Sequence, residues 1–191
     1  MLIIYGLGNN ENKYLKTKHN IGRIVVENLA AKLGKSFAKK NLIWATGSGQ
    51  TLLAYSNGYM NESGLPLLQL IQYYKPDLED LMILVIQDDS DQFISKAKLL
   101  PAGGTAGHRG IISINQHLTS PNLKSNQIWR LKIGIREPMN KSKSETFVLS
   151  QYTLAEEQKA LELANTLFDN LELISQLKIT KLQEVIHNQN N

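Results

Sequence analysis

Short apolar runs separated by polar turns recur along the chain, and their lengths predict strands. Residues 2–7 and 81–86 are almost continuously apolar, which is typical of strands buried on both faces. Residues 128–135 alternate between apolar and polar positions, as half-buried strands do. Residues 42–45 and 52–56 flank a glycine-containing turn and predict a hairpin-like pair. With one more alternating segment, the expected strands are 2–7, 42–45, 52–56, 81–86, 95–100 and 128–135.

Apolar residues at helical spacing predict helices between these strands. Residues 21–33 carry such a stripe, and Gly34 follows where a C-cap glycine belongs. Pro66 suits the first turn of a helix that runs from Ser63-Gly64 to about residue 74. The glycine-rich stretch 101–107 precedes a helix over about 109–118. Thr153 and Glu156 form a capping-box pattern that starts a helical C-terminal region, whose apolar stripe is expected to include Leu161, Ala164, Phe168, Leu171 and Ile174.

The order of these elements indicates the fold class. Strands and helices alternate, with no internal repeat and no linker, so we expect one α/β domain over residues 1–186. Its sheet should be mixed but largely parallel, with helices on both faces. The asparagine-rich end, residues 187–191, is expected to be a frayed polar tail.

Composition narrows the classes of protein that the chain can represent. It has 191 residues, 42% of them apolar and 20% charged, which is typical of a folded globular protein. It has no cysteine, which excludes a disulfide framework, a thiol nucleophile and a thiolate zinc site. The longest apolar run, 81–86, is far shorter than the roughly 20 residues that span a bilayer. The first residues do not resemble a signal peptide, so we expect a soluble cytoplasmic protein.

The formal net charge of +4 is unevenly distributed. Residues 1–50 carry +6 and residues 101–150 carry +5, whereas 51–100 carry −4 and 151–191 carry −3. If the two basic segments folded onto one face, that face would attract a polyanion such as nucleic acid. Scattered solvated lysines explain the charge equally well.

Several common site types are absent from the sequence. Gly6 and Gly8 follow a strand, but Glu11 stands where a dinucleotide fingerprint needs its third glycine. There is no Walker loop and no Gly-x-Ser-x-Gly nucleophile elbow. The four histidines show no tight metal-binding spacing, so no metal site is expected.

Four polar residues remain at the ends of predicted apolar elements: Asn9, His19, Asn61 and Asp88. In an open α/β sheet, ligands bind beyond the carboxyl ends of the strands. A histidine and an aspartate that meet there can form a general-base pair, and asparagine can orient water or a carbonyl oxygen. Each residue also has a purely structural interpretation, as a cap, a turn residue or a solvated strand end. The residues alone therefore indicate no more than a possible hydrolytic crevice.

Five blocks of sequence, in order, resemble the motifs of bacterial-type peptidyl-tRNA hydrolases. The resemblance covers residues 2 to about 180. The blocks are Gly-Leu-Gly-Asn at 6–9 with Tyr14 and Thr-Lys-His-Asn-Ile-Gly at 17–22, Tyr-Met-Asn-Glu-Ser-Gly at 59–64, Val-Ile-Gln-Asp-Asp at 85–89, Lys-Ala-Lys at 96–98 with the glycine-rich loop 103–110, and Arg-Leu-Lys-Ile-Gly-Ile at 130–135 with 147–149.

This resemblance implies an enzyme that cleaves the ester joining a peptide to the 3′ end of tRNA, without metal or cofactor. His19 would be the base that activates water, and Asp88 would hold its basic tautomer. Asn61 would orient the water and bind the peptide carbonyl. Asn9 would contact the peptide backbone near the ester and help to reject free aminoacyl-tRNA.

The resemblance also implies how substrate is held. Tyr14 and Tyr59 would line the crevice, with Met60 in its apolar wall. Lys98 and Lys132 align with basic positions that grip tRNA phosphate, a task that suits lysine as a mobile point charge. The expected partner is tRNA, with no membrane and no metal, and the protein is expected to be a monomer.

The sequence departs from the family pattern near the expected crevice, and the largest change is Arg109, where the family has a substrate-binding asparagine. Arginine only donates hydrogen bonds, so Arg109 could clamp a phosphate, pair with Asp88 or obstruct the site. These changes leave an alternative open, a diverged homologue that binds RNA or a ribosomal partner without hydrolysis; a metabolic hydrolase is a third interpretation. The other departures are Asn10-Glu11 for Pro-Gly, Gln87 for His, Ser90 for an apolar residue and Leu100 for a basic one.

Overall fold

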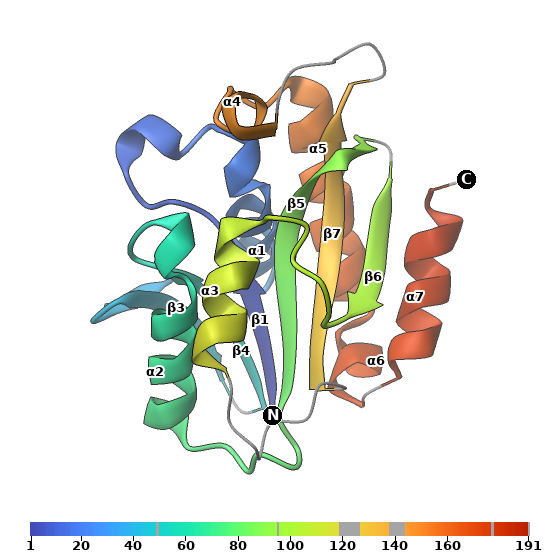
Figure 1. The fold of residues 1–191 in the computed structure, drawn as a ribbon. Helices are drawn as coiled ribbons and strands as arrows, with labels where there is room; N and C mark the ends of the chain where they lie inside the picture. Colours follow the sequence, from blue (N-terminus) through green and yellow to red (C-terminus); the bar gives the residue numbers. More distant parts are fainter. Residues whose placement is uncertain (49, 95, 119–126, 138–143, 177, 191) are drawn as a thin grey trace.

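The computed structural model describes residues 1–48, 50–94, 96–118, 127–137, 144–176 and 178–190. In this part of the chain, seven strands form one mixed sheet in the order β2-β3-β4-β1-β5-β7-β6 (Figure 1). The four central strands β4, β1, β5 and β7 are parallel, whereas β2, β3 and β6 pair antiparallel with their neighbours. The strands are β1 (Leu2–Gly6), β2 (Ala38–Lys40), β3 (Ile43–Ser48), β4 (Thr51–Ser56), β5 (Met82–Phe93), β6 (Ala97–Pro101) and β7 (Ile128–Arg136).

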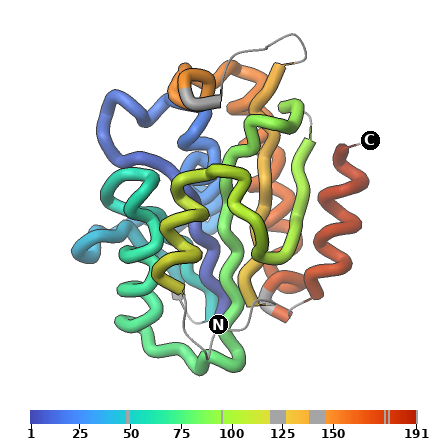
Figure 2. Tube along the Cα trace, viewed as in Figure 1, coloured from blue at the N-terminus to red at the C-terminus, as the bar shows by residue number. Residues whose placement is uncertain are grey.

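Helices cover both faces of this sheet, as expected from the alternation of elements (Figure 2). One face packs on α1, α5, α6 and α7, and the other packs on α2 and α3. The predicted fold class is therefore confirmed. The helices are α1 (Ile21–Lys32), α2 (Gly64–Tyr74), α3 (Arg109–His117), α4 (Ser144–Val148), α5 (Leu154–Asp169), α6 (Leu171–Ser175) and α7 (Ile179–Asn188), with 3-10 turns η1 (Asn12–Tyr14), η2 (Lys18–Asn20) and η3 (Met60–Glu62).

The central strand β1 shows why its sequence is apolar throughout. Leu2 and Ile4 belong to the core under α1 and α5, whereas Ile3 and Tyr5 belong to the core under α2 and α3. A strand with helices on both faces has no solvent side, so the usual alternation disappears.

Two strands differ from the sequence predictions, one in where it ends and one in that it was not predicted. The strand expected to end at residue 86 continues to Phe93, and Asp88 and Asp89 lie inside it, paired with Ile133 and Gly134 of β7. Polar side chains hide this continuation because they break the apolar pattern. β2 was not expected at all, since its three residues are polar or exposed.

The predicted apolar stripe of the C-terminal region is partly wrong. Leu161 and Phe168 are 37% and 39% exposed, whereas Ala164 and Ile174 are buried and Leu171 packs against the core. The stripe of α5 that faces the core comprises Ala160, Leu163, Ala164 and Leu167. The helix does begin at the predicted capping box of Thr153 and Glu156.

Residues 187–190, the described part of the expected frayed tail, are ordered by contacts with the rest of the fold. α7 continues to Asn188, and the Asn190 side chain accepts a hydrogen bond from Ala97 N and donates one to Ala97 O. The Gln183 amide donates to Leu99 O. Side-chain amides from the C-terminal segment thus form hydrogen bonds with backbone groups of the edge strand β6. Among the described residues, no helix is long and apolar enough to cross a membrane.

The start of α1 is packed directly against the ends of β1 and β5. A Cβ on Gly22 would lie 2.1 Å from the Ile86 carbonyl oxygen, so only glycine allows this approach. The turn η2 immediately precedes α1, and this close packing therefore carries His19 to the carboxyl end of the parallel strands.

Candidate active site

A pocket of about 910 Å³ lies at the carboxyl edge of the central strands. Its walls come from the segment after β1, from η2, from η3 and the residue before it, from β5 and β7, from the loop before α3, and from α4 with the residues that follow it. All but one of the residues predicted for the site line it; they are Asn9, Tyr14, His19, Tyr59, Met60, Asn61, Asp88, Arg109 and Lys132. The exception is Lys98.

His19 and Asp88 are in direct contact. The His19 Nδ1 lies 2.7 Å from Asp88 Oδ1, and the side chains are 11% and 2% exposed. Burial would raise the pKa of Asp88, but the adjoining His19 and His108 imidazoles hold it well below its usual range. Asp88 is therefore a carboxylate, able to accept the Nδ1–H of His19.

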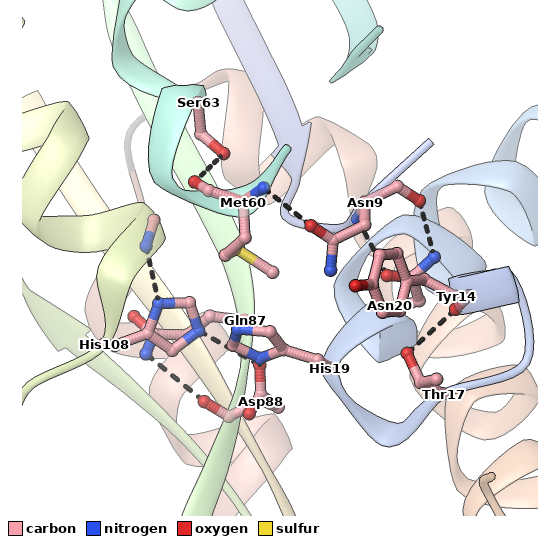
Figure 3. Close-up of polar contacts among 11 residues, drawn as sticks. Asn9, Tyr14, Thr17, His19, Asn20, Met60, Ser63, Gln87, Asp88 and His108 are labelled. Atoms are coloured by element: carbon pink, nitrogen blue, oxygen red, sulfur yellow. Dashed lines mark hydrogen bonds and ion pairs between the residues drawn. The ribbon is translucent and has the colours of Figure 1, made fainter. Parts of the chain in front are cut away.

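A second histidine, absent from the predicted site, shares the same carboxylate. The His108 Nε2 lies 3.0 Å from Asp88 Oδ1, and the two imidazole centroids are 4.9 Å apart (Figure 3). His108 stands directly before α3, at the end of the glycine-rich loop. This position, directly before a helix that follows the glycine-rich loop, is the sequence signal for a place near the strand ends.

The donor atoms of His19, Asp88 and His108 all lie within 4.8 Å of one another, which also raises the possibility of a metal site. The surroundings of His108 argue otherwise, since Gly110 N–H donates to its Nδ1 at 3.2 Å. A metal-bound histidine usually donates a hydrogen bond from its other nitrogen, which Nδ1 cannot do here. The arrangement fits a hydrogen-bonded group better than a metal centre.

The turn that carries His19 is anchored on both sides. Lys18 Nζ forms a buried ion pair with Glu156 Oε2 at 2.5 Å, which ties the turn to the start of α5. The Asn20 side chain bonds both backbone groups of Asn9, accepting from N at 2.8 Å and donating to O at 2.8 Å. These bonds place His19 in a fixed position between β1 and α5.

Asn9 joins two walls of the pocket. Its Oδ1 accepts a hydrogen bond from Met60 N at 2.8 Å, and its Nδ2 is turned toward the two histidines (Figure 3). Met60 is 3% exposed, whereas Tyr59 and Asn61 on either side of it are exposed at the pocket. The site thus combines a His–Asp pair, the oriented side-chain amide of Asn9 and an apolar wall.

Comparison with known proteins identifies the family of the chain. The sequence profile of the peptidyl-tRNA hydrolase family matches residues 3–191. The chain belongs to the peptidyl-tRNA hydrolase family. Since the members of this family are enzymes, the chain is classed as one.

Individual peptidyl-tRNA hydrolases agree with this assignment. That of Aliarcobacter butzleri (strain RM4018) is 35% identical over 187 residues, which cover 97% of this chain and 96% of the relative. That of Latilactobacillus sakei is 40% identical over 157 residues, covering 80% and 84%. The crystal structure of the Acinetobacter baumannii peptidyl-tRNA hydrolase matches with a TM-score of 0.78 at 27% identity, covering all of this chain and 93% of that one.

Asn10 and Glu11, which depart from the peptidyl-tRNA hydrolase pattern, have defined contacts. Asn10 accepts a hydrogen bond from Arg23 Nη1 at 2.8 Å and donates one to Asn57 Oδ1 at 2.7 Å. The Glu11 carboxylate accepts a hydrogen bond from the Tyr59 hydroxyl. The loop that these residues form is therefore attached to the opposite wall of the pocket.

The basic residues differ in their surroundings. Lys132 Nζ lies 2.6 Å from Asp89 Oδ2, so an acidic partner offsets its charge. Lys98 is opposite Lys132 in the β6–β7 pair and is exposed. Arg109 is exposed at the rim of the pocket.

Proposed function

We propose that the protein hydrolyses the ester bond between the peptide and the tRNA in peptidyl-tRNA, releasing free tRNA for reuse. One observation carries the proposal: the 2.7 Å contact between His19 and a buried Asp88 carboxylate, at the floor of a pocket in a chain of this family. We also propose that the protein acts as a monomer in the cytoplasm.

In the proposed reaction His19 is the general base. Asp88 accepts the Nδ1–H, which leaves His19 Nε2 with a lone pair that can take a proton from water. The water oxygen then bonds to the ester carbonyl carbon. When the bond from that carbon to the ribose oxygen breaks, the leaving oxygen takes the proton back from His19. The products are a peptide with a free carboxyl group and a tRNA with a free hydroxyl, and no metal takes part.

The two asparagines would hydrogen-bond the substrate and the attacking water in this step. Asn9 is oriented by its bond to Met60 N, so its Nδ2 is a positioned donor for the peptide next to the ester. A free aminoacyl group lacks that peptide bond and would bind less well. Asn61 would orient the attacking water and bind the carbonyl oxygen.

The remaining predicted residues would hold the substrate. Tyr14 and Tyr59 would line the path of the peptide, with Met60 as its apolar wall. Lys98 and Lys132 would lie along the tRNA backbone, with Lys132 shared between Asp89 and phosphate. Arg109, exposed at the rim, would contact phosphate.

The substrate assignment is tested with a defined N-acetyl-dipeptidyl-tRNA and the matching free aminoacyl-tRNA, both with a chelator present. We expect release of tRNA from the peptidyl substrate at a rate at least about 10²-fold above that from the aminoacyl substrate. Equal rates on both substrates, or no release at all, would contradict the proposal.

A second candidate is a protein that binds RNA or a ribosomal partner without hydrolysis, which the exposed Arg109 in place of the family's asparagine favours. The substitution Arg109→Asn separates the two candidates. A large gain in hydrolysis would support the binding protein, whereas an unchanged or lower rate would support an adapted enzyme.

A further inference from the structure

We propose that His108 is a positioning residue, whose Nε2–H shares the Asp88 carboxylate with His19 and so sets the basicity of the His19 imidazole. This inference rests on the proposed function and deepens it. Nothing in the local sequence pattern assigns such a role, because the two histidines are far apart in the chain and come together through the fold, where both contact Asp88.

The hydrogen bonds of His108 determine its tautomer. His108 is the N-cap of α3, and Gly110 N–H donates to its Nδ1 at 3.2 Å. A ring nitrogen that accepts a hydrogen bond must carry a lone pair, so the proton of the neutral ring is on Nε2. This Nε2–H points at Asp88 Oδ1, 3.0 Å away. In its neutral form, His108 is therefore oriented as a donor to Asp88.

The packing around Gly110 keeps the cap in place. A Cβ at Gly110 would lie 2.7 Å from Met60 Sδ and 2.9 Å from Leu7 Cδ1. The first turn of α3 is thus pressed against Met60 in the pocket wall and against the buried Leu7 at the end of β1. The His108 ring, 8% exposed, has little freedom to turn away from Asp88.

Two donors on one carboxylate oxygen have a consequence for the base. Each N–H stabilises part of the Asp88 charge, so less of it is available to stabilise the imidazolium form of His19. If the His108 donor is removed, His19 should become more basic. It would then stay protonated, and unable to take a proton from water, up to a higher pH.

Other charged and titratable groups also face this cluster. The pocket is lined by Tyr14 of η1, Tyr59 before η3, Arg109 of α3, Asp91 of β5, and Asp89 of β5 with Lys132 of β7, the last two paired with each other at 2.6 Å. They remain unchanged in variants of His108, so their effect on a pH profile cancels in a comparison with the wild type.

Two substitutions separate the two bonds of His108. His108→Asn keeps an N-cap oxygen for Gly110 N–H, since asparagine is among the best N-cap residues, but its short amide falls short of Asp88. His108→Gln places an amide N–H near the position of Nε2 and restores the donor to Asp88. His117→Asn, near the other end of α3, is the matched control; its Nδ1 lies 2.8 Å from Ser113 O.

The measurement is the pH dependence of kcat/KM for peptidyl-tRNA hydrolysis, with the melting temperature of each variant. We expect His108→Asn to melt within a few degrees of the wild type, while its acid limb moves up by at least about half a pH unit. His108→Gln should return the limb to within about 0.2 unit of the wild type, and His117→Asn should not move it. An unshifted limb in His108→Asn would overturn the inference, as would the same shift in His108→Gln.

Long-range nitrogen NMR of the imidazoles gives a readout that does not depend on activity. We expect His108 to show a protonated Nε2 and an unprotonated Nδ1, and the His19 titration to move to higher pH in His108→Asn. If the wild type shows this pattern but hydrolyses no peptidyl-tRNA, the proposed function fails and the inference about His108 stands. A protonated Nδ1 on neutral His108 would overturn it.

Discussion

At Asp88 two physical effects act in opposite directions, and the outcome decides the chemistry of the site. Burial disfavours the charged carboxylate, whereas two imidazole N–H groups on Oδ1 favour it and hold its pKa well below its usual range. A carboxylate that is charged throughout the neutral range can keep His19 in one tautomer. Asp88 therefore orients the His19 imidazole that we propose as the base.

The lowered pKa of Asp88 makes a prediction about stability. A carboxyl whose folded pKa lies below its ordinary value of 3.8 contributes stability above that value and loses it as the pH falls through the folded pKa. Asp88→Asn has no such titration. We expect the difference in melting temperature between wild type and Asp88→Asn to shrink from about pH 5 to about pH 2.5, below the range in which histidine titrates. A constant difference over this range would contradict the assigned charge state.

At the scale of elements, the active-site turn η2 depends on a helix far away in the sequence. Lys18 and Glu156 are both almost completely buried, and Glu156 also accepts the Thr153 N–H in the capping box of α5. A buried charge that loses its partner is costly, by about 3–5 kcal/mol. The pair thus couples the position of His19 to the start of α5.

A double-mutant cycle tests this coupling. Glu156→Gln removes the charge but retains a residue type that suits the capping box, and Lys18→Met removes the amine but keeps most of the side chain. We expect each single variant to lower the free energy of unfolding in urea, and the double variant to lose at least about 1 kcal/mol less than the sum of both. Additive losses would show that the two residues act independently.

The elements themselves follow largely from the sequence, and the exceptions have physical causes. The predicted helices over 21–33, 63–74 and 109–118 are present within about two residues, because caps such as Gly34 mark their ends. The prediction ends β5 too early because Asp88 and Asp89, which belong to the site, interrupt the apolar pattern although they still pair with β7. The place of His108 just before α3 indicates that it lies near the strand ends, but its bond to Asp88 joins two separate elements, which no local spacing encodes.

At the scale of the whole molecule, exposed lysines lie at both edges of the sheet. Lys39 of the first basic segment lies on β2 at one edge of the sheet, whereas Lys98 lies on β6 at the other edge (Figure 1). The side that carries Lys98 and Lys132 is the one that adjoins the pocket.

This asymmetry predicts where tRNA binds. Lys98→Gln should weaken tRNA binding and reduce the slope of log affinity against log salt by about one, as for the loss of one phosphate contact. Lys39→Gln, also exposed but on the opposite edge, should change neither. The measurement is a titration of labelled tRNA at several salt concentrations. Equal effects of the two substitutions would indicate binding by net charge alone.

The central claim is that His19, held by Asp88, is the base in peptidyl-tRNA hydrolysis. It is tested most directly by the single-turnover rate of His19→Ala with enzyme in excess over peptidyl-tRNA, so that binding is saturated. The account predicts a rate about 10²–10⁴-fold below that of the wild type, with tRNA affinity nearly unchanged. A rate within a few-fold of the wild type would contradict it.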